Sequence, residues 1–150
     1  MTNLNNIYDS SVSLDGHDLR EMFLLVVRLF ECHVDSINAL NVFPVPDGDT
    51  GVNMFITLRE VAKQAENIDS NLAGEVAEVM AKGALFEARG NSGVILCQFF
   101  EGIAKGLNGL RTFSSSEFAS ALRYASDHAY AAVSEPVEGT MLTVLNNVAN

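Results

Sequence analysis

The sequence has 150 residues, of which 48% are hydrophobic and 19% are charged, and its formal net charge is −10. This length fits one domain with a substantial core, and this composition excludes a disordered chain. The negative charge opposes nucleic-acid phosphates and anionic membranes, so neither is an expected partner.

The start of the chain and its cysteines bear on the cellular compartment. The segment MTNLNNIYDSSVSLDG contains neither a basic region nor an apolar region of the kind found in signal peptides, and no apolar run approaches the roughly 18 residues of a membrane span. Cys32 and Cys97 lack CxxC spacing, which is typical of reduced thiols. We expect a cytoplasmic protein with a flexible N-terminal segment at 1–15 and one helical domain at 16–150.

The first predicted helix runs from Leu19 to about Leu40, and Asp15 or Asp18 is available near its start. Spacings of three and four residues, or their sums, define its apolar stripe. This stripe consists of Met22, Leu25, Val26, Leu29, Ile37 and Leu40.

Five more helices are predicted after it. The second begins at Thr50 or Gly51, and the others cover about 72–88, 91–107, 115–133 and 139 to beyond 148. Gly90 is a predicted helix stop, and Asn91 or Ser92 is the predicted cap of the next helix. The buried stripe expected for that helix is Val94, Ile95, Phe99, Ile103 and Leu107. No segment alternates with period two, so we predict an all-α fold, a helical barrel or bundle.

The stretch NVFPVPDGDTGVNM, which begins at Asn41, places two carboxylates at the start of the second helix. Unit charges about 4 Å apart repel by about 4 kcal/mol at an effective dielectric of about 20, and a cation relieves that repulsion. Mg²⁺ prefers oxygen ligands and keeps water or phosphate oxygens in its remaining positions, so Asp47 and Asp49 suffice as protein ligands. The free N–H groups from Thr50 to Asn53 add an expected anion-binding surface. The loop therefore predicts a site for a metal and a phosphate.

Other interpretations of this loop exist. In the simplest, Asp49 only caps a helix in a solvated turn. An EF-hand that starts at Asp47 is excluded, because its sixth and twelfth positions are Val52 and Leu58 rather than Gly and Glu. A phosphatase of the haloacid-dehalogenase type requires its aspartates at the end of a buried strand, and Pro44 and Pro46 disfavour a strand here without excluding it.

Two later loops have similar features. ARGNSGVIL, residues 88–96, joins two helices and offers backbone N–H groups and the Ser92 hydroxyl to a phosphate or ribose, although a serine-capped turn explains the same residues. EPVEGTMLTV, residues 135–144, again places Gly and Thr at the start of a helix. Three such helix starts in one small domain favour a functional interpretation more strongly than one does.

The histidines and Arg89 are weaker candidates. His33 lies on or beside the apolar stripe of the first helix, which favours a packed histidine over a catalytic one. His17 and His128 have no supporting context. Arg89 is able to meet a phosphate, but a cation in the last turn of a helix is stabilising without any ligand. We leave Arg89 out of the predicted site.

The three motifs, in this order, resemble the nucleotide-binding domain of the dihydroxyacetone-kinase family (DhaL-like), in the branch found in bacterial fatty-acid kinases. The resemblance covers nearly the whole chain from about Leu19. It implies an all-helical barrel that binds ATP through two Mg²⁺ ions. Asp47 and Asp49 match the metal-binding pair of the family, and Asn41 falls near a third aspartate of the dihydroxyacetone-kinase branch. The residues that match nucleotide contacts are Thr50, Gly51, Asn53, Asn91, Ser92, Thr140 and Met141.

The resemblance also implies a partner and a reaction. In this family a separate protein presents the phosphoryl acceptor: a DegV-like protein holding a fatty acid, or a subunit holding dihydroxyacetone. We therefore expect a kinase that forms an acyl phosphate, with a dihydroxyacetone-kinase subunit or a noncatalytic Mg-nucleotide module as alternatives, and a homodimer as a further expected assembly. No catalytic residue is assigned. Val52 departs from the Thr common in the branch, and the domain of the family continues beyond the position of Asn150, so we expect a longer native protein.

Overall fold

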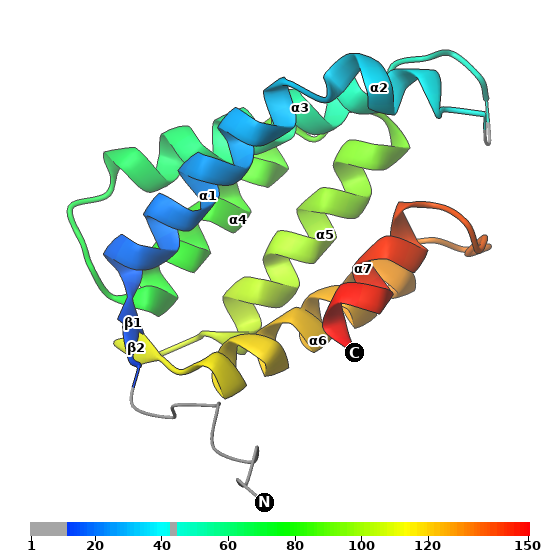
Figure 1. Ribbon diagram of the computed structural model, residues 1–150. Coiled ribbons are helices and arrows are strands. Elements are labelled where there is room, and N and C mark those ends of the chain that lie inside the picture. Colours follow the sequence, from blue (N-terminus) through cyan, green and yellow to red (C-terminus); the bar gives the residue numbers. More distant parts are fainter. Residues whose placement is uncertain (1–11, 43–44) are drawn as a thin grey trace, which may run out of the picture.

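The computed structural model describes residues 12–42 and 45–150. The described residues form seven helices and one small antiparallel sheet of two strands (Figure 1). The prediction of an all-α fold is therefore confirmed, apart from these two short strands. In chain order the elements are β1 (Leu14–Asp15), α1 (Gly16–Glu31), α2 (Val34–Ala39), α3 (Thr50–Asn67), α4 (Ala73–Glu87), α5 (Gly90–Gly106), β2 (Thr112–Phe113), α6 (Ser115–Ala131) and α7 (Met141–Ala149).

The start of α1 is fixed by a short sheet and by a capping box. Leu14 pairs with Phe113 in the antiparallel sheet, where Phe113 is fully buried. Asp15 accepts hydrogen bonds from the backbone N–H groups of His17 and Asp18, and the Asp18 carboxylate accepts one from the N–H of Asp15. Of the expected flexible segment 1–15, residues 1–11 lie outside the described part of the chain. Its last two residues form β1.

The long first helix predicted from the sequence is divided in two. α1 ends at Glu31, and α2 begins at Val34. The Sγ of Cys32 bonds the carbonyl oxygen of Arg28, and the Nδ1 of His33 lies 2.9 Å from the carbonyl oxygen of Leu29. These contacts give the carbonyl oxygens of Arg28 and Leu29, in the last turn of α1, side-chain partners. The apolar spacing of the sequence continues across the break, although the helix does not. His33 is satisfied by a neighbour but exposed, so its prediction as a packed residue is wrong.

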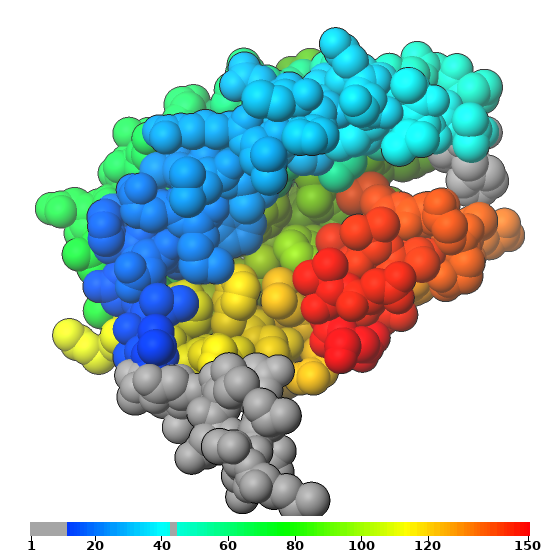
Figure 2. Space-filling model, in the orientation of Figure 1, coloured from blue at the N-terminus to red at the C-terminus, as the bar shows by residue number. Residues whose placement is uncertain are grey.

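The buried face of α1 also differs from the predicted stripe. Leu19 and Phe23 enter the core, and the ring of Phe23 lies 5.2 Å from that of Phe100 on α5. The predicted stripe residues Leu25, Val26, Leu29 and Leu40 are exposed. In Figure 2, α1 (blue) and α7 (red) lie on either side of a strip where α5 (green) and α6 (yellow) reach the surface.

Arg20 links α1 to the end of α3. Its Nε donates to the carbonyl oxygen of Ala65 at 2.7 Å, and its Nη2 donates to the carbonyl oxygens of Ile68 and Ser70. The last carbonyl groups of a helix lack partners within the helix and carry partial negative charge, so a guanidinium stabilises them. Arg20 therefore stabilises the end of α3 and the residues after it, and joins them to α1.

α4, α5 and α6 supply the centre of the core. The buried apolar side chains of α5 are Leu96, Cys97, Phe100 and Ile103, with Leu107 just after it. The predicted stripe was therefore right at Ile103 and Leu107, but Val94 is exposed, and Ile95 and Phe99 are half-buried. α5 packs closely on α6 because small residues meet at their crossing, where a Cβ added to Gly102 would lie 2.3 Å from the Cα of Ala125.

Two further expectations concern membranes and thiols. None of the helices in residues 12–42 and 45–150 combines the length and the apolar character needed to cross a membrane. Cys32 is exposed and Cys97 is buried, and both are free. Burial, with a smaller effect from Glu101, raises the pKa of the Cys97 thiol.

Candidate functional site

The three glycine-containing loops precede α3, α5 and α7, and these three helices begin at the same end of the bundle (Figure 1, right). The β1–β2 pair lies at the opposite end. The topology therefore brings the three predicted motifs to one end of the molecule, although more than 30 residues separate each from the next.

The two aspartates of the first loop differ in their contacts. Asp47 and Asp49 are both exposed. The Oδ1 of Asp47 accepts a hydrogen bond of 2.6 Å from the Nδ2 of Asn41, so the structure brings these two predicted ligands together. Asp49 occupies the N-cap position of α3, but its side chain makes no capping hydrogen bond. Asp49 therefore does not cap the helix through its side chain, although it lies at the N-cap position of an exposed turn. No strand precedes the aspartates within residues 45–49, as a dehalogenase-type site would require.

The first turn of α3 is capped from another helix. The Oδ1 of Asn38, on α2, accepts hydrogen bonds from the backbone N–H groups of Gly51 at 2.8 Å and Val52 at 3.3 Å. The N–H of Asn53 donates to the carbonyl oxygen of Asp49 at 2.9 Å. The expectation of free N–H groups from Thr50 to Asn53 is therefore wrong for Gly51, Val52 and Asn53, because each already has an acceptor.

The second loop packs against this same turn. Gly90 has a φ of 60°, a left-handed conformation that favours glycine, and a Cβ added there would lie 2.7 Å from the Nδ2 of Asn53. Ser92 is buried, and its hydroxyl lies 3.5 Å from the carbonyl oxygen of Thr50. Asn91 is exposed beside it. Two of the predicted nucleotide motifs are thus in direct contact.

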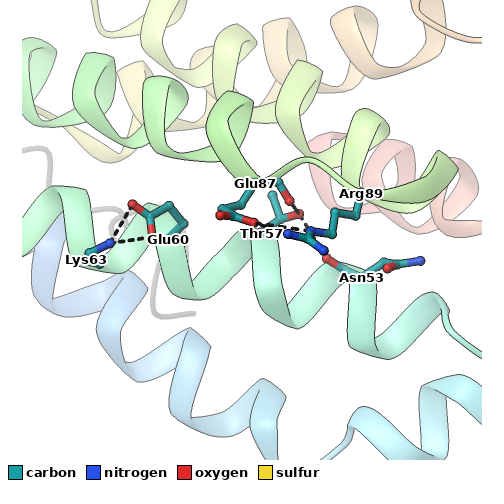
Figure 3. Close-up of polar contacts among 6 residues, drawn as sticks. All are labelled: Asn53, Thr57, Glu60, Lys63, Glu87 and Arg89. Carbon is teal, nitrogen blue, oxygen red and sulfur yellow. Dashed lines mark hydrogen bonds and ion pairs between the residues drawn. The ribbon is translucent and has the colours of Figure 1, made fainter.

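The start of α5 differs from its prediction. The helix begins at Gly90, its N-cap residue is Arg89, and no side chain caps it. Asn91 and Ser92 are therefore in the first turn rather than at the predicted cap position. Arg89 donates to the carboxylate of Glu87 at 3.1 Å, and both side chains are at least one-third exposed (Figure 3). The guanidinium of Arg89 lies near Asn53, in the first turn of α3 (Figure 3).

The third loop is held by its own hydrogen bonds. The Glu138 carboxylate accepts from the Tyr130 hydroxyl at 3.2 Å and from the Thr143 hydroxyl at 2.6 Å. Thr140 caps α7 by accepting from the N–H of Leu142, and Met141 packs partly buried against the core. Burial, together with the bond to Glu138, raises the pKa of Tyr130. Among the described residues, no hydrogen bond joins this loop to the first two.

The oxygen donors of the first loop fit a hard divalent cation. Asp49 has no capping bond, Asp47 has a single amide donor, and neither forms an ion pair with a Lys or Arg in the described part of the chain. In that part no three His, Cys, Asp or Glu side chains gather into a complete metal cage. Mg²⁺ does not require one, because it is usually held by one or two carboxylates together with water and substrate phosphates.

A separate surface groove has no relation to these loops. It has a volume of about 340 Å³, lies between α4 and α5, and is lined by residues that include Glu78, Leu85 and Lys105. None of the predicted site residues lines it. Asn38, which caps α3, was not among the predicted residues, because a side chain 13 residues before its partner gives no local capping signal.

Comparisons with known proteins identify a family and several relatives. The model of the DAK2 domain family matches residues 44–150. Protein YloV of Bacillus subtilis is 44% identical over 137 residues, which cover 91% of this chain and 25% of that protein. An uncharacterized protein of Staphylococcus saprophyticus is 42% identical with the same coverage, and one of Staphylococcus aureus is 39% identical over 136 residues. The chain spans about a quarter of the length of these relatives.

The chain belongs to the DAK2 domain family. This family is part of the dihydroxyacetone-kinase group, so the chain is a kinase-related nucleotide-binding module, and the resemblance read from its three motifs is confirmed. The names of the relatives do not distinguish the fatty-acid kinase branch from others.

Proposed function

We propose that this domain binds MgATP and supplies the γ-phosphoryl group to an acceptor held by a partner protein. The observation that carries the proposal is the exposed Asp47–Asp49 pair, in which Asp49 is free of a capping role, beside the contact between Asn53 and Gly90. Membership of a kinase-related nucleotide-binding family supports the same function.

Asp47 and Asp49 would hold the metal, and Asn41 would orient Asp47 through its amide and offer its own oxygen. Bound Mg²⁺ neutralises charge on the phosphate oxygens and orients them. The aspartates would act as electrostatic ligands rather than as bases. Because positioning and charge neutralisation account for most of the catalysis of phosphoryl transfer, the domain needs no nucleophile of its own.

Of the seven predicted residues, six would contact the nucleotide through their side chains, and Gly51 would instead allow α2 to pack on the start of α3. Thr50, Gly51 and Asn53 start α3, Asn91 and Ser92 start α5, and Thr140 and Met141 start α7. Gly51 is buried under α2, and the backbone N–H groups of Gly51 and Asn53 already have acceptors. Side chains rather than the backbone amides of α3 would therefore meet the phosphates. The residues at α7 would lie near the base or ribose.

The proposed acceptor is the carboxylate of a fatty acid held by a DegV-like protein. In the reaction a carboxylate oxygen forms a bond to the γ-phosphorus, the bond from that phosphorus to the β,γ-bridging oxygen breaks, and ADP leaves with the electron pair. The products are an acyl phosphate and ADP. Dihydroxyacetone on a partner subunit is the alternative acceptor, and a module that binds MgADP without phosphoryl transfer is the noncatalytic alternative.

Calorimetric titration of ATP, with and without Mg²⁺, tests the binding function. We expect binding that requires Mg²⁺ and is lost in Asp47→Ala and in Asp49→Ala, while the helical circular-dichroism signal is unchanged. Asp127→Ala is the matched control, because Asp127 is also exposed but lies on α6. Unchanged affinity in both site variants would contradict the proposal.

A second experiment separates the catalytic alternatives. The protein is incubated with MgATP and a fatty-acid-loaded DegV-like protein, and acyl phosphate is trapped with hydroxylamine. Hydroxamate formation that depends on Asp49 supports the fatty-acid kinase function. Nucleotide binding without hydroxamate, but with phosphorylation of dihydroxyacetone on its own binding subunit, favours that branch, and transfer to neither favours the noncatalytic module.

A further inference from the structure

The cap of α3 comes from α2 rather than from its own N-cap residue. In this chain Asp15, Ser114 and Thr140 each occupy the N-cap position of a helix and accept a hydrogen bond from the first turn. Asp49 holds the same position at α3 and makes no such bond. Aspartate is among the residues that cap helices most strongly, so this exception requires an explanation.

The explanation lies in the contact between α2 and Gly51. The Oδ1 of Asn38 accepts from the N–H groups of Gly51 and Val52, which are N–H groups that an N-cap side chain ordinarily serves. A Cβ added to Gly51 would collide with the carbonyl oxygen of Val34 and lie 2.9 Å from Asn38 Oδ1. Only a glycine at this position allows α2 to approach closely enough for Asn38 to cap α3.

We propose that Asn38 is a positioning residue for the metal site. By capping α3 from outside, it leaves both carboxylate oxygens of Asp49 available to a divalent cation held jointly with Asp47. The inference rests on the proposed function, because it assigns Asn38 a role toward the same metal. Without Asn38, the Asp49 carboxylate turns to the free N–H groups of α3, and that bond competes with the cation.

The chemistry of the side chain agrees with this role. An asparagine supplies a strong acceptor without charge, whereas a carboxylate at the same place would add a third negative charge beside Asp47 and Asp49. The backbone of α3 is therefore satisfied at no electrostatic cost to the metal-free site. A capping residue selected only for stability has no need to lie on a different helix.

The size of the effect follows from the energy of a cap. An N-cap bond is worth about 0.5 to 2 kcal/mol, and a cation must break the Asp49 cap to bind in Asn38→Ala. With Mn²⁺ as the probe cation in place of Mg²⁺, the affinity of that variant should therefore fall about two- to thirtyfold. Ser114→Ala is the matched control, because it removes the N-cap of α6 and should lower the melting temperature while leaving Mn²⁺ affinity unchanged.

A double-variant cycle on the metal-free full chain supplies a readout that does not depend on binding. Asp49→Ala should not lower the melting temperature in the unaltered chain, since Asp49 makes no cap there. In the Asn38→Ala background, Asp49→Ala should lower the melting temperature, because Asp49 has become the cap of α3. Asn38→Asp adds a negative charge but retains the acceptor, so in its background Asp49→Ala should again not lower the melting temperature.

The outcomes separate the two claims. An unchanged Mn²⁺ affinity in Asn38→Ala, or an equal effect of Asp49→Ala on the melting temperature in both backgrounds, would overturn the role of Asn38 and leave the proposed function intact. If the unaltered chain binds no Mn²⁺ with or without ATP, the proposed function fails, and the role of Asn38 is overturned with it.

Discussion

The hydroxyl of Thr57 donates to the carbonyl oxygen of Glu87, 3.2 Å away, and so connects α3 to the end of α4 (Figure 3). Thr57 is completely buried, and the same hydroxyl lies 3.0 Å from the carbonyl oxygen of Asn53. Because Glu87 directly precedes the loop that contains Gly90, this bond sets the distance between the first two motifs.

Thr57→Val should therefore destabilise the domain. Valine has nearly the shape of threonine, so the packing is retained while the hydroxyl proton shared between the two carbonyl oxygens is lost. We expect the free energy of unfolding to fall by about 1 to 2 kcal/mol in urea denaturation. Thr112→Val is the control, because Thr112 is exposed and should change this free energy by less than about 0.5 kcal/mol. Equal losses in the two variants would contradict the role of the Thr57 bond.

Gly90→Ala should affect both stability and nucleotide binding. The left-handed conformation costs a residue other than glycine about 1 to 2 kcal/mol, and the new methyl group would lie against the amide of Asn53 and displace it. Gly109→Ala is the matched control, because Gly109 has a φ of 74° but no atom near its added Cβ. Urea denaturation should show similar losses for both variants, whereas calorimetry should show weaker MgATP binding only for Gly90→Ala. Weaker binding in both would assign the effect to general destabilisation.

The capping box of α6 should make stability depend on pH. Hydrogen bonds from the backbone N–H and the hydroxyl of Ser114 lower the pKa of Glu117 from its ordinary value of 4.5. A carboxyl group whose pKa is lowered by folding stabilises the folded state above pH 4.5, and this stabilisation is lost as the pH falls through the lower folded value.

Comparison with Glu117→Gln isolates this contribution. The difference in melting temperature between the unaltered chain and the variant should be greatest near neutral pH and should shrink toward zero in acid. The comparison also removes the effect of Glu60, whose pKa is lowered by its bonds to Gln64 and Lys63 in both proteins. A difference that stays constant from pH 7 to pH 3 would contradict the prediction.

Local sequence signals predicted much of this fold. The start of α3 at Thr50 and the start of α6 at Ser115 follow from turn and capping residues close to them in the chain. The break between α1 and α2 was missed because the apolar spacing continues through Cys32 and His33, while the turn there depends on side-chain bonds to preceding carbonyl groups. Periodicity locates an apolar stripe but does not show which flank of it meets a neighbouring helix.

The site was predictable in composition but not in its connections. Asp47 and Asp49 stand out because two carboxylates with a glycine between them lie at a predicted helix start, where their repulsion favours a cation. That Asn38 rather than Asp49 caps α3 depends on α2 lying across Gly51, which is a tertiary contact. The contact between Gly90 and Asn53 likewise depends on how α3 and α5 pack, and no pattern in either motif encodes it.

The pairing of Leu14 with Phe113 has a consequence for the order of folding. α3 through α7 form successive neighbouring pairs along the chain, and contacts between neighbours in sequence form quickly. α1, in contrast, needs Phe100 for its buried ring and β2 for its first residues. During synthesis its partners emerge long after it does, since domains assemble as their segments become available. α1 is therefore expected to dock fully only after β2 and α5, which follow it in the chain, have formed.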